Sequence, residues 1–218
     1  MPPLGPENLA PPSGAPEPKR LRLFVAVDLP HDVRRLLVDT IEALKHAAGA
    51  DAVRWVRPDG IHLTLKFLGA TAEDRVPLIH TALRLGVGDS EPFDVTPIGV
   101  GSFGGSRNLR VIWVGLGGDG GALADLAERV ERALAPLGFP KEDRAFNAHL
   151  TLGRVRDTAG RDDRARVHDA LTHFAAPLYP AFRVDRVSLI ESVLGPGGAA
   201  YRQLGAYPLR GVPQGEAS

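Results

Sequence analysis

Apolar and polar residues follow one another along this chain in patterns that predict both strands and helices. Residues 22–29 form an apolar and β-branched run, which is typical of a buried strand. Pro30 opens a predicted helix with apolar residues at helical spacing, and Gly49 ends it. After a turn at residues 58–60, the run at residues 61–69 predicts another strand.

The second half of the chain repeats this order of elements. Residues 110–116 predict a strand, residues 120–137 a helix and residues 149–154 a further strand. The repetition therefore extends over a complete strand–helix–strand unit.

A single shift of 87 positions relates the two halves. It places the strand at residues 24–29 on the strand at residues 111–116. The same shift places the tripeptide His-Leu-Thr at residues 62–64 on an identical tripeptide at residues 149–151. Because strand and tripeptide keep one offset across a helix and a loop, we interpret the pattern as an internal duplication.

The duplication predicts the fold class. Residues 93–95 resemble residues 182–184 at a shift of 89, so each copy also contains a further helix and strand. We expect an α+β fold of two similar lobes, each an antiparallel sheet with helices. The lobes should face each other across a pseudo-two-fold axis, with an active-site cleft between them.

The two ends of the chain differ in composition from its centre. Residues 1–20 hold seven of the nineteen prolines and few apolar residues, which predicts a disordered tail. Residues 211–218 resemble them, and we expect a second flexible tail there. The bilobal domain should therefore occupy residues 21–210.

Composition narrows the classes of function. The formal net charge is zero, which argues against a broad polyanion-binding surface but leaves room for a local phosphate pocket. The absence of cysteine excludes disulfides, thiolate metal sites and a cysteine nucleophile. No apolar run reaches the roughly 18 residues of a membrane span, and no secretory signal is evident, so we expect a cytoplasmic protein without membrane contact.

The paired tripeptides carry the candidate chemistry. Residues two apart in a strand point to the same face, so His62 and Thr64 should share one face and their neighbouring leucines the other. His149 and Thr151 should do the same in the second copy. Each strand would thus bury leucines and present an imidazole and a hydroxyl to the cleft.

Two facing histidines suit the cleavage of a phosphodiester. A neutral imidazole accepts a proton from water while a protonated one donates to the departing oxygen, and an ordinary pKa of about 6.5 allows both forms. Thr64 and Thr151 would donate hydrogen bonds to the non-bridging phosphate oxygens. Arg154, at the end of the second strand, would bind a phosphate oxygen or the RNA backbone.

Other residues fit the pattern less well. A lone His-x-Thr in a strand has almost no specificity, and His31, His46, His80, His168 and His173 have no partner in the repeat, so we expect them on the surface. Lys66 has the cleft-facing parity of His62, but its counterpart is Gly153. A surface salt bridge is the alternative for Arg154.

Three alternative functions stay open. Residues 115–120 satisfy the G-x-G-x-x-G fingerprint of dinucleotide sites, but no acidic residue ends a strand about 20 positions on, and a flexible strand-to-helix connection also explains the glycines. A metal site at His62 and His149 would need a third ligand, and neither motif carries an acidic residue on the matching face. A non-catalytic module that binds RNA ends would present the same pocket, and only an assay separates it from an enzyme.

The two motifs also resemble a known family. His-Leu-Thr-Leu at residues 62–65 and 149–152 looks like the paired signature of the 2H phosphoesterase superfamily, and most closely that of the RNA 2′,3′-cyclic phosphodiesterases, historically called 2′-5′ RNA ligases. The resemblance covers roughly residues 21–210 and includes these flanking residues: Leu23 to Asp28, Trp55, Phe67 to Gly69, Arg154, Ser192 and Tyr201. Ala148 departs from it, because a proline often precedes the second histidine in the family.

The resemblance implies a reaction and roles. His62 would be the proton donor and His149 the proton acceptor, without a metal or another cofactor. The reaction would open RNA 2′,3′-cyclic phosphate ends, including those of tRNA halves, to 2′-phosphates, with reversible 2′-5′ ligation as a minor activity. We expect a monomer. The near identity of the two motifs means that the residues alone do not assign donor and acceptor.

Overall fold

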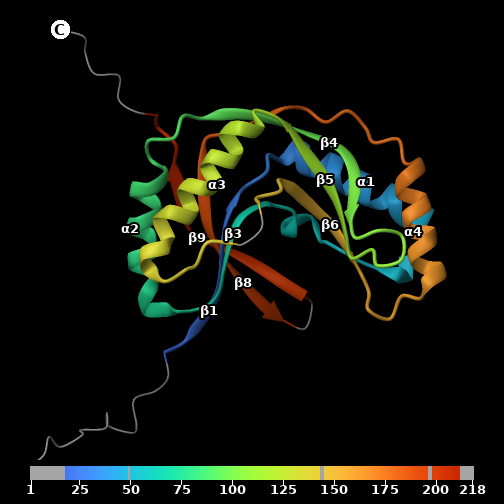
Figure 1. Cartoon of the computed structure of the whole chain (residues 1–218), viewed down its shortest axis with the longest axis horizontal. Coiled ribbons are helices and arrows are strands. Elements are labelled where there is room, and N and C mark those ends of the chain that lie inside the picture. Colours follow the sequence, from blue (N-terminus) through green and yellow to red (C-terminus); the bar gives the residue numbers. More distant parts are fainter. Residues whose placement is uncertain (1–17, 49, 143–144, 196–197, 212–218) are drawn as a thin grey trace, which may run out of the picture.

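The computed structural model describes residues 18–48, 50–142, 145–195 and 198–211, and it has an α+β fold (Figure 1). The helices are α1 (His31–Ala48), α2 (Val76–Val87), α3 (Gly120–Leu134) and α4 (Arg161–His173). The strands are β1 (Arg20–Val27), β2 (Val53–Trp55), β3 (Leu63–Ala72), β4 (Phe93–Phe103), β5 (Val111–Gly118), β6 (His149–Val155), β7 (Phe182–Val184), β8 (Arg186–Gly195) and β9 (Gly198–Pro208). Short 3-10 turns lie at Ala50–Ala52, Pro58–Gly60, Glu73–Arg75 and Ala135–Leu137.

The strands form a continuous antiparallel sheet. They hydrogen-bond in the order β7-β4-β5-β6-β3-β1-β8-β9, and β2 lies beside β6. The half β3-β1-β8-β9 meets the half β7-β4-β5-β6 where β3 pairs with β6. The predicted α+β class with antiparallel strands is confirmed.

Two pairs of helices cover the two halves of this sheet. α2 and α3 pack together and contact β9 and β3, whereas α1 and α4 pack together and α4 contacts β4 (Figure 1). α1 follows β1 in the chain, but it packs with α4, which contacts β4 in the other half of the sheet. α3 follows β5, but it packs with α2 and contacts β3, again in the other half. Each lobe therefore combines segments from both halves of the sequence.

The register of the sheet shows the pseudo-two-fold axis that the duplication predicts. β3 pairs with β6 through Leu63 and Leu150, which are equivalent residues at the shift of 87. β4 pairs with β7 through Asp94 and Arg183, which are equivalent at the shift of 89 and form an ion pair of 3.0 Å. An antiparallel pair between equivalent residues is what a two-fold axis produces.

One large core lies between the sheet and the helices. The apolar stripe of α1 is at most 2% exposed at Val33, Leu37, Ile41 and Leu44, as its helical spacing predicts. A second, small cluster of Phe24, Ala26, Ile190 and Tyr201 lies apart from this core. Both faces of β1 are therefore buried from Leu23 to Val27, because Leu23, Val25 and Val27 belong to the large core, whereas Arg20 and Arg22 are exposed.

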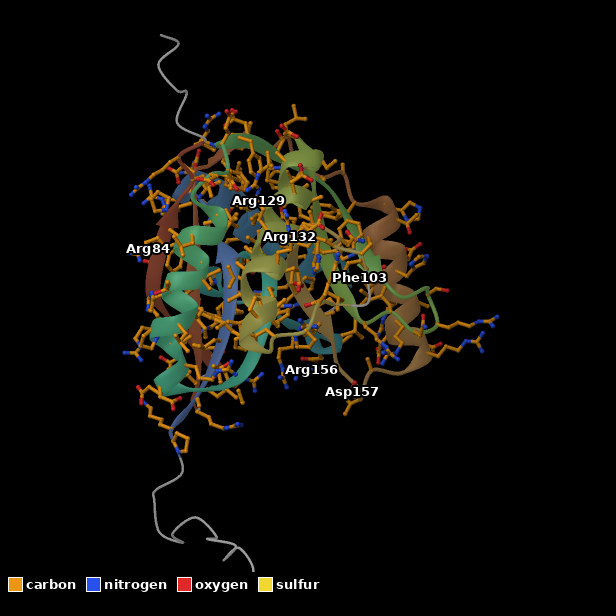
Figure 2. The ribbon with its side chains drawn as sticks, turned by 60° about the vertical axis from the view of Figure 1, so that its left-hand side comes forward. Arg84, Phe103, Arg129, Arg132, Arg156 and Asp157 are labelled. Atoms are coloured by element: carbon orange, nitrogen blue, oxygen red, sulfur yellow. The ribbon has the colours of Figure 1, made fainter. Side chains whose placement is uncertain are left out.

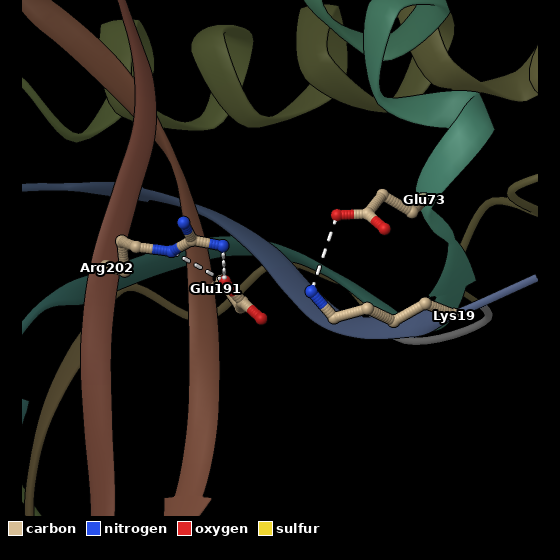
Figure 3. Close-up of polar contacts among 4 residues, drawn as sticks. All are labelled: Lys19, Glu73, Glu191 and Arg202. Atoms are coloured by element: carbon tan, nitrogen blue, oxygen red, sulfur yellow. Dashed lines mark hydrogen bonds and ion pairs between the residues drawn. The ribbon is translucent and has the colours of Figure 1, made fainter.

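The two ends of the domain differ slightly from the expected boundaries. Arg20 already belongs to β1, and Lys19 forms an ion pair with Glu73 (Figure 3). At the other end, the Gly211 amide donates a hydrogen bond to the Ser90 carbonyl. The remaining parts of the two predicted tails, residues 1–17 and 212–218, lie outside the described residues. Within the described part of the chain, every helix is too short or too polar to cross a membrane.

Candidate active site

The pairing of β3 with β6 brings the two motifs together. Because Leu63 lies opposite Leu150 in an antiparallel pair, His62 lies toward Thr151 and Thr64 toward His149. The leucines of both motifs are buried in the core, whereas the four polar side chains are only partly buried. All four therefore share one face of the sheet, which we call the motif face, as strict alternation predicts.

Equivalent bulges interrupt both motif strands. The β1–β3 register shifts so that Leu65 is the extra residue, and the β5–β6 register shifts so that Leu152 is the extra residue. These positions are 87 apart, so the duplication has kept the bulge. A bulge reverses the alternation beyond it. The residues that follow each motif therefore lie on the face opposite to the one that alternation predicts.

Lys66 is consequently not on the motif face, and the parity that the sequence assigned to it is wrong. Its side chain is 2% exposed, and its ammonium bonds to a carboxylate oxygen of Glu131 at 2.5 Å and to the Pro140 carbonyl at 2.8 Å. Lys66 thus joins β3 to α3 and to the segment that leads toward β6.

The bulge at Leu152 has the opposite effect on Arg154, because it places this residue on the motif face. Gly153 and Val155 are buried, whereas Arg154 is exposed. Burial and the charge of Asp59 raise the pKa of Tyr201, whereas the positive charges of Arg57 and Arg154 act to lower it. Arg154 therefore lies on the same face as His149 and Thr151, and its charge acts on Tyr201.

Aromatic rings enclose His62. Its imidazole stacks on Phe24 at 4.5 Å between centroids, and Tyr201 meets it edge-on at 5.3 Å. Burial lowers the pKa of His62 to about 4, while the charge of Asp28 raises it and that of Arg34 lowers it. In the ligand-free protein His62 is therefore neutral at neutral pH.

Asp28 is the charged group that favours protonation of His62. The β1–β3 register pairs Ala26 with Thr64 and Val27 with Leu63, so its next step places Asp28 opposite His62. The Asp28 carboxylate accepts a hydrogen bond of 2.6 Å from the Ser188 hydroxyl, which in turn accepts one of 2.7 Å from the Gln203 amide. This chain of hydrogen bonds holds the carboxylate at the end of β1.

His149 has a different environment. The ring of Phe103, at the end of β4 (Figure 2), meets it edge-on at 4.8 Å. Its Nδ1 lies 2.7 Å from the carbonyl oxygen of Asn147. Since a carbonyl only accepts, Nδ1 carries the hydrogen, and the neutral ring presents the lone pair of Nε2.

Ser192 and Tyr201, which the resemblance placed in the closing segment of the family, pair with each other across β8 and β9. Tyr201 contacts both His62 and Phe24. The closing segment therefore completes the wall around the first histidine.

The first part of the glycine run, up to Gly118, belongs to strand β5, Asp119 caps α3 and Gly120 begins that helix, which corrects the interpretation as a flexible connection. Gly115 lies opposite His149, and Cβ atoms at Gly115 and Gly117 would lie 3.2 and 3.0 Å from Ile98. Both neighbours of β5 are antiparallel, whereas the dinucleotide fingerprint opens a parallel βαβ unit. Close packing of β4 on β5 explains these glycines.

The donors available to a metal ion are few in the described part of the chain. Nowhere in it do three or more His, Asp or Glu side chains gather as a group that could hold a metal ion. The donors around His62 and His149 are the two imidazoles, the Asp28 carboxylate beside His62 and neighbouring hydroxyls, and they do not form such a group.

Sequence reasoning did not identify Asp28, Phe103 and Asn147 as neighbours of the histidines. Asp28 has the parity of Phe24 and Ala26 in β1, but its position beside His62 depends on the register of two strands far apart in sequence. Phe103 reaches His149 from the end of a long strand that has no motif. Of these three residues, only Asp28 had a usable signal in the sequence, namely its place in the alternation of β1.

Known proteins match most of this chain. Residues 30–196 match the model of the 2′-5′ RNA ligase superfamily. The chain is 34% identical over 184 residues to an RNA 2′,3′-cyclic phosphodiesterase of Archaeoglobus fulgidus, covering 84% of this chain and 98% of that protein. It is 32% identical over 191 residues to one of Methanothermobacter thermautotrophicus, covering 87% and 100%.

Solved structures share the fold over most of the chain. The Thermus thermophilus protein TT0787 superposes with a TM-score of 0.71 at 27% identity, covering 88% of this chain and 99% of that one. E. coli LigT in complex with 3′-AMP superposes with a TM-score of 0.65 at 26% identity, covering 87% and 98%. Together with the match over residues 30–196, these similarities show that the chain belongs to the 2′-5′ RNA ligase superfamily.

Proposed function

We propose that this protein hydrolyses 2′,3′-cyclic phosphodiester ends of RNA to 2′-phosphomonoesters by acid–base catalysis between His62 and His149. The observation that carries the proposal is the Leu63–Leu150 register, which gathers two imidazoles and two hydroxyls on one face. Relatives named RNA 2′,3′-cyclic phosphodiesterase at 34% and 32% identity support the substrate and the reaction.

His149 serves as the proton acceptor in this proposal. The hydrogen bond from Nδ1 to the Asn147 carbonyl leaves the lone pair of Nε2 for a proton from the attacking water. The hydroxide equivalent then adds to phosphorus. A backbone carbonyl that orients a histidine base is a common second partner for such a ring.

His62 serves as the proton donor to the departing 3′ oxygen. This role requires a protonated ring, whereas burial lowers the pKa of His62 to about 4 in the ligand-free protein. A bound phosphodiester anion raises that pKa, and Asp28 acts in the same direction. We therefore propose that the substrate itself charges the donor.

Thr64, Thr151 and Arg154 bind phosphate groups of the substrate, the two threonines at the reacting cyclic phosphate and Arg154 at the RNA backbone beside it. The two hydroxyls are neutral donors beside the histidines, and they suit the non-bridging oxygens on which charge develops. Arg154 adds a guanidinium at the edge of the same face, where it attracts an anionic RNA end.

The RNA substrates in this proposal include tRNA halves, and the protein acts as a cytoplasmic monomer. One chain supplies all four motif side chains, so the site needs no partner subunit. Ligation is the reverse reaction, with a 5′-hydroxyl in place of water. Because water is in large excess, hydrolysis dominates.

Turnover of a short RNA with a 2′,3′-cyclic end, measured in the presence of EDTA, tests the proposal. We expect hydrolysis in EDTA with a bell-shaped pH dependence, since the two imidazoles need opposite protonation states. Binding of the RNA end without turnover would support the non-catalytic module instead. Loss of activity on chelation that zinc or manganese restores would support a metal-dependent site.

A further inference from the structure

Arg54 and Arg154 lie directly opposite each other where β2 pairs with β6. Side chains opposite each other in an antiparallel pair point to the same face, with Cβ atoms about 5 Å apart. Both arginines are exposed. Because like charges placed this way destabilise a sheet, the arrangement calls for a functional reason.

Elsewhere the same sheet pairs an arginine with a carboxylate. Arg202 on β9 lies opposite Glu191 on β8, and its Nε and one terminal nitrogen both donate to one carboxylate oxygen (Figure 3). By contrast, within the described ranges no carboxylate lies at ion-pair distance from Arg54 or Arg154. The Arg54–Arg154 pair therefore holds two positive charges without a counter-ion from the described chain.

The pair is continuous with the candidate active site. Arg154 shares the motif face with His149 and Thr151. β2 and β3 both pair with the same edge of β6, β3 at Leu150 and β2 from Gly153 to Val155. Along β6 the pair lies three residues from Thr151, about 10 Å at roughly 3.3 Å per residue.

We propose that Arg54 and Arg154 form a second phosphate subsite, which binds the internucleotide phosphate on the 5′ side of the terminal nucleoside. The proposal rests on the proposed function and deepens it. An RNA that ends in a cyclic phosphate continues only in the 5′ direction, so this phosphate is the next anion along the strand. Two guanidiniums suit its oxygens, and the phosphate removes their mutual repulsion.

The subsite specifies the class of substrate. A nucleoside 2′,3′-cyclic phosphate fills only the space between the histidines, whereas a dinucleotide or longer RNA also reaches Arg54. The protein should therefore prefer oligonucleotide ends over free cyclic nucleotides. For a single strand, log affinity falls as log salt concentration rises, and each phosphate contact makes this fall steeper by about 0.7.

The experiment compares kcat/KM on a dinucleotide with a 2′,3′-cyclic end and on a nucleoside 2′,3′-cyclic phosphate. The variants are Arg54→Gln and, as a matched control, Arg132→Gln, which removes an exposed arginine from α3 (Figure 2). We expect the dinucleotide-to-nucleoside ratio to fall roughly ten-fold or more in Arg54→Gln, as for a lost charge-assisted hydrogen bond. Arg132→Gln should keep the wild-type ratio.

Two further readouts separate the subsite from the fold and from the reaction. The melting temperature of Arg54→Gln should equal or exceed that of the wild type, because the substitution removes a like-charge contact. The affinity of the inactive variant His149→Ala for the same dinucleotide should fall when Arg54→Gln is added. The dependence of this affinity on salt concentration should also become less steep. This binding test holds even if the wild type hydrolyses neither substrate, which would refute the proposed function alone. An unchanged ratio, or unchanged binding and salt slope, would overturn the subsite.

Discussion

Leu63 and Leu150 lie opposite each other at the junction of the two halves of the sheet, and each is the central residue of a His-Leu-Thr motif. Both are fully buried. Because they are equivalent in the internal repeat, the pseudo-two-fold axis passes between them. This axis relates His62 and Thr64 to His149 and Thr151. The symmetry of the fold therefore creates the arrangement of the candidate site, and the surroundings of each histidine make it asymmetric.

Removal of either imidazole should nearly abolish hydrolysis of a 2′,3′-cyclic RNA end. His62→Ala and His149→Ala each remove a proton-transfer group that typically contributes about 10²–10⁴-fold to the rate. Because the two act in one transition state, the double variant should be little slower than either single variant. Initial rates measure this, with His46→Ala on the exposed end of α1 as the control. Wild-type rates in either single variant would rule out the acid–base pair.

Asp28→Asn should move the alkaline limb of the kcat pH profile to lower pH. The Asp28 carboxylate raises the pKa of His62, so its loss lowers that pKa and deprotonates the donor earlier. An asparagine oxygen still accepts the Ser188 hydrogen bond, and Asp39→Asn on α1 is the control. If the acid limb moved instead, His62 would be the acceptor.

The free energy of unfolding should depend on pH because the imidazole of His62 is buried. Its folded-state pKa, about 4, lies below the unfolded value of about 6.5, so the unfolded chain binds the proton first as the pH falls. The stabilisation is therefore complete above pH 6.5 and lost as the pH falls toward 4, by about 2–3 kcal/mol. Urea unfolding at pH 7 and pH 4.5 measures it. The wild type should lose this much more than His62→Phe, and equal losses would contradict the burial of the imidazole.

Lys66 should behave as a structural residue. Its ammonium and the Glu131 carboxylate are nearly inaccessible, with side-chain exposures of 2% and 12%. Lys66→Met leaves the carboxylate without its partner, and we expect a loss of roughly 3 kcal/mol in the free energy of unfolding. The double substitution Lys66→Met with Glu131→Leu should recover most of it. A folded Lys66→Met protein with normal stability but no turnover would instead place Lys66 in the reaction.

The sequence predicted the parts of this molecule that depend on local pattern. Repetition at a shift of 87 was enough for the α+β class and the matched motifs, and alternation was enough to separate His62 and Thr64 from their leucines. Alternation failed at Lys66, and strict alternation would also have turned Arg154 toward the core. The bulges at Leu65 and Leu152 are visible only in the register with neighbouring strands, and they exchange the faces of the residues that follow.

The packing of helices and the partners of the histidines also depended on long-range contacts. Nothing local indicates that α1 packs with α4 and α3 with α2, because these contacts join segments far apart in the sequence. Asn147 is two residues from His149, yet its carbonyl is identified as the partner of Nδ1 only by the backbone conformation before β6.

Phosphorus nuclear magnetic resonance of the product tests the central claim most directly. A short RNA ending in a 2′,3′-cyclic phosphate is incubated with the protein in EDTA, and the product ester is identified by its phosphorus signal. We expect a 2′-phosphomonoester, because the proposed donor His62 protonates the 3′ oxygen while water activated by His149 attacks phosphorus. A 3′-phosphomonoester would reverse the assignment of the leaving group. An unchanged cyclic phosphate would contradict the proposed hydrolysis itself.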